Sequence, residues 1–265
     1  MNDAKKTGKV IIAGAGPGDE ELITLKLQKR LAEAEIIITD RLVNPAIISL
    51  HANASAPVIL TGKEGFNQAS YSQQQINDLI ISHALEGKTV LRLKGGDVAF
   101  FSNVLDELDA LVKYQIPFEI IPGITAASGV SAYAGIPLTA RNHSQGVHFI
   151  TFNPSSDISI EKWKVLADTQ DTIVFYMASK NLAKLATRLL EADASPGKPI
   201  AIIEQATTPY QQVHVSTLQK CIIDFGDKKF SSPSMVIVGD VVSLHKQFNW
   251  FTVKNETGTI FKDLK

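Results

Sequence analysis

Residues 10–19 read VIIAGAGPGD, an apolar run followed at once by a glycine-rich loop. The apolar run predicts a buried strand at 10–13, and the glycines allow the backbone to turn sharply and to approach a ligand closely. The loop fits a dinucleotide-binding fingerprint poorly, because Pro17 removes a backbone donor and Asp19 stands in place of the third glycine. Taken alone, it favours a plain strand–helix turn in which Asp19 caps the helix.

Short apolar runs alternate with amphipathic segments along the rest of the chain. Several runs are apolar almost throughout, which is typical of strands covered on both faces of a sheet. One helical segment has readable ends, since Ser72 and Gln75 form a capping box and Gly87 follows its apolar face. This alternation predicts an α/β fold with largely parallel strand pairing. The expected strands are 10–13, 35–39, 58–60, 89–93, 118–121, 147–151, 172–176, 200–204, 213–216 and 235–238.

The segment 122–141 interrupts this rhythm with Pro122-Gly123, a run of small residues and a second proline at Pro137. A division here gives two halves of similar size, each within the usual range for a domain. We therefore expect an N-terminal α/β domain at 1–122, which holds the glycine-rich loops, and a C-terminal α/β domain at 123–265. The sequence has no low-complexity linker, which favours close packing of the two with a cleft between them.

The composition narrows the class of protein. The net charge is −1 and the charges are dispersed, which weakens a nucleic-acid or membrane-surface partner. Cys221 is the only cysteine, and no Cys/His cluster has metal-ligand spacing, so we expect a reducing compartment and no metal. The polar N-terminal segment lacks the apolar core of a signal peptide, and no apolar run is long enough to span a bilayer. The expected location is the cytoplasm.

Two further loops resemble the first in their position. RLKGGD (92–97) and PGITAAS (122–128) each follow an expected strand. Each could be a tight turn, with Asp97 capping the next helix. Loops at the carboxyl ends of strands in one α/β domain often border the same crevice. Three such loops in one half therefore favour a ligand site.

These segments together resemble the tetrapyrrole methylase family. The matching stretches are GAGPGD (14–19), TDRLV (39–43), GKEG (62–65), RLKGGD (92–97), PGITAASGVSAYAGIPLT (122–139), VFYM (174–177) and FNWF (248–251). They span nearly the whole chain in order, and the fifth points to the members that methylate uroporphyrinogen III at carbon. The resemblance implies two α/β domains with a cofactor trough between them, a homodimer, and S-adenosylmethionine as the methyl donor without a metal.

The resemblance also implies a donor site made largely of backbone groups. Asp97 is the natural partner for a ribose hydroxyl or for the donor's ammonium group, because an ionised carboxylate accepts strong hydrogen bonds. Met177 has a plain alternative as a core residue after a strand. Carried over position by position, the donor contacts are Pro17, Gly95, Gly96, Asp97, Phe100, Thr125, Ala126, Met177 and Ala206.

For the chemistry, the resemblance implies Asp40 as the general base and Lys63 as the general acid. The plain alternatives are a local Asp40–Arg41 ion pair and a solvated lysine. Uroporphyrinogen carries eight carboxylates, so the site should present cations. The candidates are Arg41, Lys63, Arg92, Lys94 and Arg141, and His143 is a weaker one.

The match departs from the family pattern at three places. The family's PFIFGRGGEE is VAFFSNVLDE at 98–107, its THRD is TARN at 139–142, and its TGH is TFN at 151–153. The lost arginine and histidines would face a polyanionic substrate, so these changes bear on substrate and rate rather than on the donor. The alternatives are a methylase of the same fold acting on a later precorrin, on diphthamide or on ribosomal RNA, and a non-catalytic protein that binds S-adenosylmethionine. A nicotinamide-dependent dehydrogenase is disfavoured by Pro17.

Overall fold

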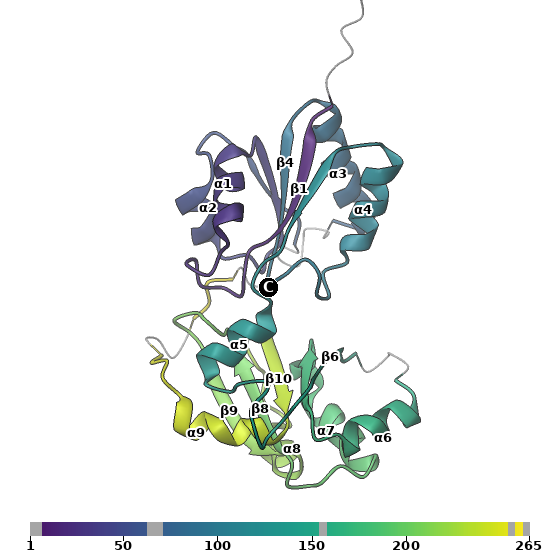
Figure 1. Cartoon of the computed structure of the whole chain (residues 1–265), viewed down its shortest axis with the longest axis vertical. Coiled ribbons are helices and arrows are strands. Elements are labelled where there is room, and N and C mark those ends of the chain that lie inside the picture. The colour runs from purple at the N-terminus through teal and green to yellow at the C-terminus, as the bar shows by residue number, and fades with distance from the viewer. Residues whose placement is uncertain (1–6, 63–70, 154–157, 254–257, 262–265) are drawn as a thin grey trace, which may run out of the picture. The chain divides into compact units, whose positions relative to one another are not determined.

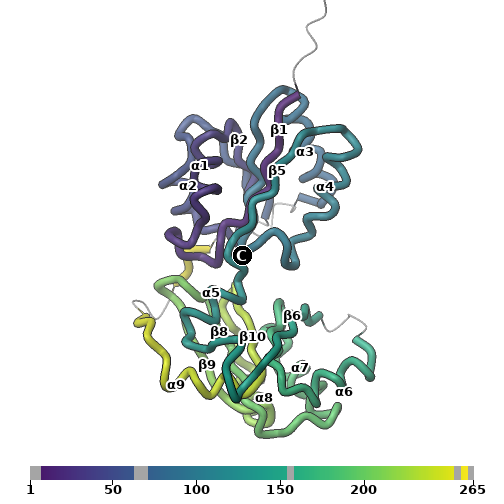
Figure 2. Tube along the Cα trace, in the orientation of Figure 1, coloured from purple at the N-terminus to yellow at the C-terminus, as the bar shows by residue number. Residues whose placement is uncertain are grey.

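The computed structural model describes residues 7–62, 71–153, 158–253 and 258–261. The contacts within the chain group its residues into two compact units. The first runs to Ala126 and adds the segment that begins at Thr259, and the second is Ala127–Gly258. The chain therefore passes from one unit to the other inside the segment 122–141 that breaks the strand–helix rhythm (Figures 1 and 2). Each unit is described by itself below.

The first unit is built on a five-stranded sheet in the order β3-β2-β4-β1-β5, and all its strand pairs are parallel. Helices α1 and α2 cover one face, and α3 and α4 cover the other (Figure 1). Both faces are therefore buried, which explains the continuously apolar strands. The elements are β1 (Lys9–Gly14), α1 (Leu25–Glu33), β2 (Ile36–Thr39), α2 (Pro45–His51), β3 (Val58–Leu60), α3 (Gln73–Leu85), β4 (Thr89–Lys94), α4 (Val104–Lys113) and β5 (Phe118–Ile121).

The caps of the helices follow the sequence in one case and correct it in another. The Ser72–Gln75 capping box of α3 forms in full, and Gly87 follows the helix with φ 93°. The expected cap at Asp19 is wrong, because α1 begins at Leu25 and Thr24 accepts the hydrogen bond from Leu27 N. Asp19 instead accepts from Glu21 N at 2.9 Å and closes a turn within the loop. The glycine loop is therefore longer than a minimal strand–helix connection.

The second unit holds a mixed five-stranded sheet in the order β6-β7-β10-β8-β9. Only β6 and β7 pair in parallel, so the expectation of largely parallel pairing is wrong for this half. The loop 205–211 joins β8 directly to β9 without a helix, which makes this pair antiparallel. The elements are α5 (Ala126–Ala134), β6 (Val147–Thr151), α6 (Ile160–Asp168), β7 (Thr172–Tyr176), α7 (Leu182–Glu191), β8 (Pro199–Glu204), β9 (Gln212–Thr217), α8 (Leu218–Phe225), β10 (Ser234–Val238) and α9 (His245–Phe248).

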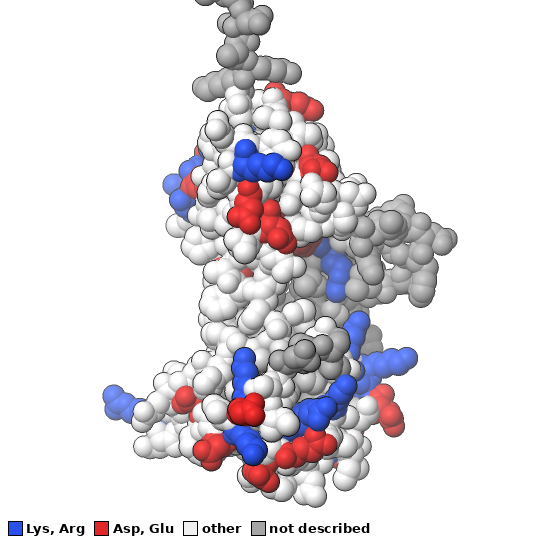
Figure 3. All heavy atoms as spheres, turned by 90° about the vertical axis from the view of Figure 1, so that its right-hand side faces the viewer, with Lys and Arg blue, Asp and Glu red and all other residues white. Residues whose placement is uncertain are grey.

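The structure shows where the dispersed charges and the single cysteine of the sequence lie. On the face drawn in Figure 3, acidic and basic side chains are interspersed on both units. Within the part of the chain that the structure describes, no helix is long and apolar enough to cross a membrane. Cys221 lies buried in the core of the second unit, where burial raises the pKa of its thiol to about 11.

An ion cluster between α1 and β5 gives the first unit a pH-dependent contribution to stability. Arg30 and Lys26 contact the Glu119 carboxylate at 2.9 and 2.6 Å and lower its pKa from 4.5 to about 2. A carboxyl group whose pKa falls on folding stabilises the protein above its unfolded pKa, and this contribution is lost as the pH falls through its folded pKa. The cluster therefore contributes fully above about pH 4.5 and fades toward pH 2.

Glu119→Gln is accordingly expected to lower the free energy of unfolding at pH 7, and its difference from the natural chain should shrink as the pH falls from 4.5 toward 2. Urea unfolding at a series of pH values measures this difference. Glu21→Gln, at an exposed position, serves as the matched control. A difference that stays constant across this pH range would contradict the assignment.

Candidate active site

Three glycine-rich loops meet at the carboxyl edge of the parallel sheet in the first unit. β4, β1 and β5 are neighbours in that sheet, so the loops that follow them leave it side by side. The first two loops are joined by two hydrogen bonds, from Gly16 N to Gly96 O at 3.0 Å and from Gly96 N to Gly16 O at 2.7 Å. The first two loops therefore lie against each other at this edge, and their role as the border of a ligand site stays a prediction.

The contact is so close that only glycine fits at its centre. A Cβ atom on Gly123 would lie 2.3 Å from Gly96 O, and one on Gly14 would lie 2.5 Å from the same oxygen. Gly16 and Gly96 also have φ angles of 79° and 68°, which disfavour any other residue. The glycines therefore let three backbones pack against one another and leave their polar groups at the edge of the sheet.

The predicted donor contacts of the first unit gather around these loops. Pro17, Gly95, Gly96, Asp97 and Thr125 are all half-buried. A Cβ atom on Gly96 would lie 3.5 Å from the backbone nitrogen of Ala126, which places this last residue of the first unit, in the third loop, against the second loop. Phe100 is 37% exposed. The structure thus brings these residues together, and their role as donor contacts stays a prediction.

Asp97 organises its own loop. Its Oδ1 accepts a hydrogen bond from Ala99 N at 2.6 Å. It does not cap the next helix as expected, because α4 begins only at Val104, after Asn103. The segment 98–107, which departs from the family pattern, forms the connection from Asp97 into the first turn of α4. Phe101 and Asn103 take left-handed conformations there, with φ 52° and 53°.

The other two predicted donor contacts lie at one edge of the second sheet. Met177 follows β7 and Ala206 follows β8 by two residues, and both strands pair antiparallel with β10. In this register Tyr176 and Ile203 both lie opposite Met235, so the two carboxyl ends are neighbours across β10. Met177 is 64% exposed with φ 59°. The alternative role of Met177 as a core residue is therefore wrong.

The loop that carries Ala206 is held by buried amide side chains. Gln211 Oε1 accepts from Thr207 N at 2.9 Å, and its Nε2 donates to Tyr133 O at 3.0 Å. Gln205 and Thr207, on either side of Ala206, have φ angles of 44° and 69°. A left-handed backbone at non-glycine residues persists only where the surroundings hold it, and such conformations are concentrated at functional sites. Gln205, Thr207 and Gln211 were missed by the sequence analysis.

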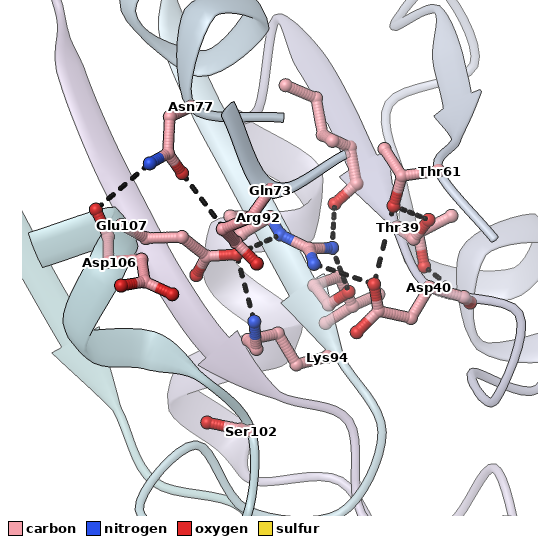
Figure 4. Close-up of polar contacts among 12 residues, drawn as sticks. Thr39, Asp40, Thr61, Gln73, Asn77, Arg92, Lys94, Ser102, Asp106 and Glu107 are labelled. Carbon is pink, nitrogen blue, oxygen red and sulfur yellow. Dashed lines mark hydrogen bonds and ion pairs between the residues drawn. The ribbon is translucent and has the colours of Figure 1, made fainter. Parts of the chain in front are cut away.

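A chain of charged side chains runs from Asp40 through Arg92 to Glu107 and Lys94 (Figure 4). Arg92 Nη2 donates to Asp40 Oδ1 at 2.6 Å, and Arg92 Nε donates to Glu107 Oε1 at 2.9 Å. Lys94 Nζ donates to the same Glu107 oxygen at 2.9 Å. Strand periodicity explains the grouping, because Arg92 and Lys94 are two residues apart on β4 and therefore lie on the same face of the sheet. Asp40 directly follows β2, which pairs with β4 in parallel. Asp40 also accepts from Thr61 Oγ1 at 3.4 Å.

Burial and neighbouring charges shift two of these groups in opposite directions. Burial alone would lower the pKa of Arg92, but the Asp40 and Glu107 carboxylates outweigh it and raise the pKa of this guanidinium. Burial, together with the neighbouring Arg92 cation, lowers the pKa of Lys94 despite its bond to Glu107. Arg92 therefore stays charged, whereas Lys94 gives up its proton more readily than an exposed lysine does.

The predicted catalytic and substrate-binding residues therefore have different surroundings. The side chain of Asp40 is 33% exposed, whereas those of Arg92 and Lys94 are 2% and 4% exposed. The charges of Arg92 and Lys94 are already balanced inside the protein, so their direct contact with substrate stays a prediction. Arg41 is half-buried and Arg141 is exposed. Lys63 lies outside the described residues.

Glu107 was missed by the sequence analysis. Its side chain is fully buried although it stands in the first turn of α4, where acidic residues are usually solvated. The available signal was indirect: two cations on one face of a buried strand require a partner. Across the described residues, no group of three or more His, Cys, Asp and Glu side chains could hold a metal ion.

Comparison with known proteins identifies the family of the chain. A family model for the tetrapyrrole (corrin/porphyrin) methylases matches residues 9–221. A siroheme synthase from Saccharophagus degradans is 41% identical over 247 residues, which cover 93% of this chain and 54% of that protein. The chain thus spans about half the length of the curated relatives that it matches.

Solved structures agree with the family match. A uroporphyrin-III C-methyltransferase from Thermus thermophilus superposes with a TM-score of 0.76 at 30% identity, covering 92% of this chain and 98% of that one. The same enzyme in complex with S-adenyl homocysteine gives a TM-score of 0.73 at 29% identity, with coverages of 89% and 93%. A cobalt precorrin-4 methyltransferase gives 0.79 at 25% identity, with coverages of 88% and 95%. The chain belongs to the tetrapyrrole methylases, as its sequence motifs predict.

Proposed function

We propose that this chain is an S-adenosylmethionine-dependent C-methyltransferase that methylates uroporphyrinogen III at C2 and then C7, giving precorrin-2. The observation that carries the proposal is the meeting of three glycine-rich loops at the carboxyl edge of a parallel sheet. Its support in related proteins is the likeness to the Thermus enzyme, whose structure was solved with S-adenyl homocysteine. The close-packed loops present main-chain groups without side chains in the way, which suits a ligand held by the backbone.

The donor supplies an electrophilic methyl group on a sulfonium, and the pyrrole carbons of the substrate are nucleophilic, so direct displacement needs no covalent enzyme intermediate. In this proposal the glycine loops, with Asp97, Thr125 and Ala126, hold the donor in line with the substrate carbon. Asp40, which is half-exposed and held by Arg92, accepts a proton from the tetrapyrrole. Arg41 and Arg141 supply positive charge for the substrate carboxylates. Met177 and Ala206 stay in the proposal as donor contacts on the family resemblance alone.

Asp97 provides a test of the donor site. Asp97→Ala is expected to weaken the binding of S-adenosylhomocysteine about ten- to a hundredfold, because a hydrogen bond to a charged group contributes about 1.5–3 kcal/mol. Isothermal titration calorimetry measures the affinity. Asp97→Asn is the informative second variant, since it retains an oxygen for Ala99 N but not the charge. Unchanged affinity in both variants would leave Asp97 as a turn residue only.

The reaction itself is tested by anaerobic incubation with uroporphyrinogen III and S-adenosylmethionine, followed by mass spectrometry of the tetrapyrrole. The proposal predicts a doubly methylated product that requires the donor. Donor binding without methylation of uroporphyrinogen III would overturn the substrate assignment. Methylation of a later precorrin instead would favour the related activity of the cobalt precorrin-4 methyltransferase, to which the fold is also similar.

The remaining parts of the proposal concern assembly and location. We include a homodimer, a cytoplasmic location and a place in sirohaem or cobalamin synthesis, all of which follow from the family resemblance. Sedimentation equilibrium of the purified chain tests the dimer, and a monomer at micromolar concentration would contradict it.

A further inference from the structure

The buried carboxylate Glu107 has no part in the chemistry described so far. It lies one helical turn before Leu111, a core residue, so it occupies the buried face of α4. Its Oε1 accepts hydrogen bonds from both Arg92 and Lys94. Its Oε2 is buried and has no hydrogen-bond partner among the described residues.

Glu107 balances the buried charges of Arg92 and Lys94, but the stability of a fold does not require that such a buried group of charges be present at all. An orphaned buried oxygen costs free energy, and replacing a buried ion pair by apolar side chains of similar size is often neutral or stabilising. A leucine at 107 would extend the apolar face that Leu111 already presents to the core. What Glu107 does contribute is the orientation of the cation beside it.

The geometry of Arg92 shows how that orientation matters. Its planar guanidinium bonds to Glu107 through Nε and to Asp40 through Nη2, while Nη1 lies near the carbonyl oxygens of Ile38 and Leu93 (Figure 4). Because the donors of a guanidinium form a rigid fork, fixing Nε fixes the direction of Nη2. We propose that Glu107 is a positioning residue for methyl transfer, which acts through Arg92 to hold Asp40 at the edge of the site. This inference rests on the proposed function of Asp40.

Lys94 has a separate part in this arrangement. It balances the second negative charge of the Asp40–Arg92–Glu107 chain, and its bond to Glu107 is the one that the structure records for its Nζ. Removing Glu107 alone would leave Lys94 buried without its counter-charge, so that variant would confuse folding with positioning. The test therefore removes both charges together.

The decisive comparison is a matched pair made in the Lys94→Met background. Lys94→Met/Glu107→Leu takes away the acceptor for Arg92 Nε, and Lys94→Met/Glu107→Gln restores a neutral acceptor with the same net charge. Positioning predicts that kcat of the Glu107→Leu variant falls about ten- to a hundredfold below that of Lys94→Met, a size typical of displaced catalytic groups. The Glu107→Gln variant should recover most of this loss, while S-adenosylhomocysteine affinity stays similar in both and thermal unfolding shows that both are folded at the assay temperature. Equal kcat values in the two variants would overturn the proposal.

Two further measurements separate failure of this inference from failure of the proposed function. In an Asp40→Asn background, the Glu107→Leu effect on kcat should largely vanish, because residues that act as a unit are not additive. The other measurement needs no substrate: the Nε–H resonance of Arg92, assigned by its loss in Arg92→Lys, should exchange slowly with solvent in the natural chain. In the Lys94→Met background, this proton should exchange faster in the Glu107→Leu variant than in the Glu107→Gln variant. An unchanged exchange rate would overturn the proposal even if no tetrapyrrole were methylated.

Discussion

Asp40→Asn is expected to slow methyl transfer by about 100- to 10,000-fold, the usual contribution of a general base. The asparagine keeps the shape of the side chain and an oxygen for Arg92 Nη2 and Thr61 Oγ1, but it cannot take up a proton. Donor binding should change less than about twofold, because the glycine loops that we assign to the donor are untouched. Single-turnover kinetics with uroporphyrinogen III measure the rate, and calorimetry with S-adenosylhomocysteine measures the affinity.

Asp109→Asn, at an exposed position of α4, is the matched control for this variant and should retain the full rate. The substitution removes the charge of one of the two carboxylates that pair with Arg92. Urea unfolding of both variants therefore verifies that the Asp40→Asn variant remains folded. An unaltered rate would return Asp40 to the simpler role of an ion-pair partner at the end of β2.

Gly123→Ala is expected to abolish tight donor binding, with a loss in affinity of at least about tenfold and a lower stability. Its Cβ would lie 2.3 Å from Gly96 O and 2.8 Å from Gly14, and all of these atoms belong to backbone that cannot turn aside as a side chain can. Relief of this clash would separate the loops, and overpacking of this kind usually costs about 1–3 kcal/mol. Calorimetric titration with S-adenosylhomocysteine and thermal unfolding measure the two effects.

The matched control is Gly197→Ala, where the nearest neighbouring atom to the new Cβ is Ser195 Oγ at 3.9 Å. That variant should keep both its affinity and its stability. If Gly123→Ala bound the donor as tightly as the natural chain does, the close packing of the three loops would not be part of the donor site.

Much of the fold was predictable because its signals are local. Short apolar runs located the ten strands that the structure describes, and the Ser72 capping box located the start of α3. The parallel order of the first sheet followed from the alternation of strands and helices. The antiparallel pairing in the second sheet did not, because it depends on the direct connection 205–211 between β8 and β9.

The glycines of the candidate site could be predicted from the sequence, because the backbone conformation allows no other residue there. The buried charges were harder to predict, because their burial depends on how the helices pack on the sheet. Gly14, Gly96 and Gly123 could be recognised in the sequence, because no other residue fits where their backbones meet. The role of Arg92 and Lys94 in substrate binding stays a prediction, and nothing in the local sequence shows that their charges are paired inside the protein. Glu107 is close to neither in the sequence, and its position became visible only once α4 was packed on the sheet. The prediction for Lys63 stays outside the described residues.

The central claim, carbon methylation of uroporphyrinogen III, is tested most directly with a ¹³C-methyl-labelled donor and NMR of the anaerobic product. The account predicts two labelled methyl groups on one tetrapyrrole, attached to C2 and C7, and their loss in the Asp40→Asn and Gly123→Ala variants. A tetrapyrrole without label, recovered from protein that binds S-adenosylhomocysteine, would contradict the account, as would label on carbons other than C2 and C7.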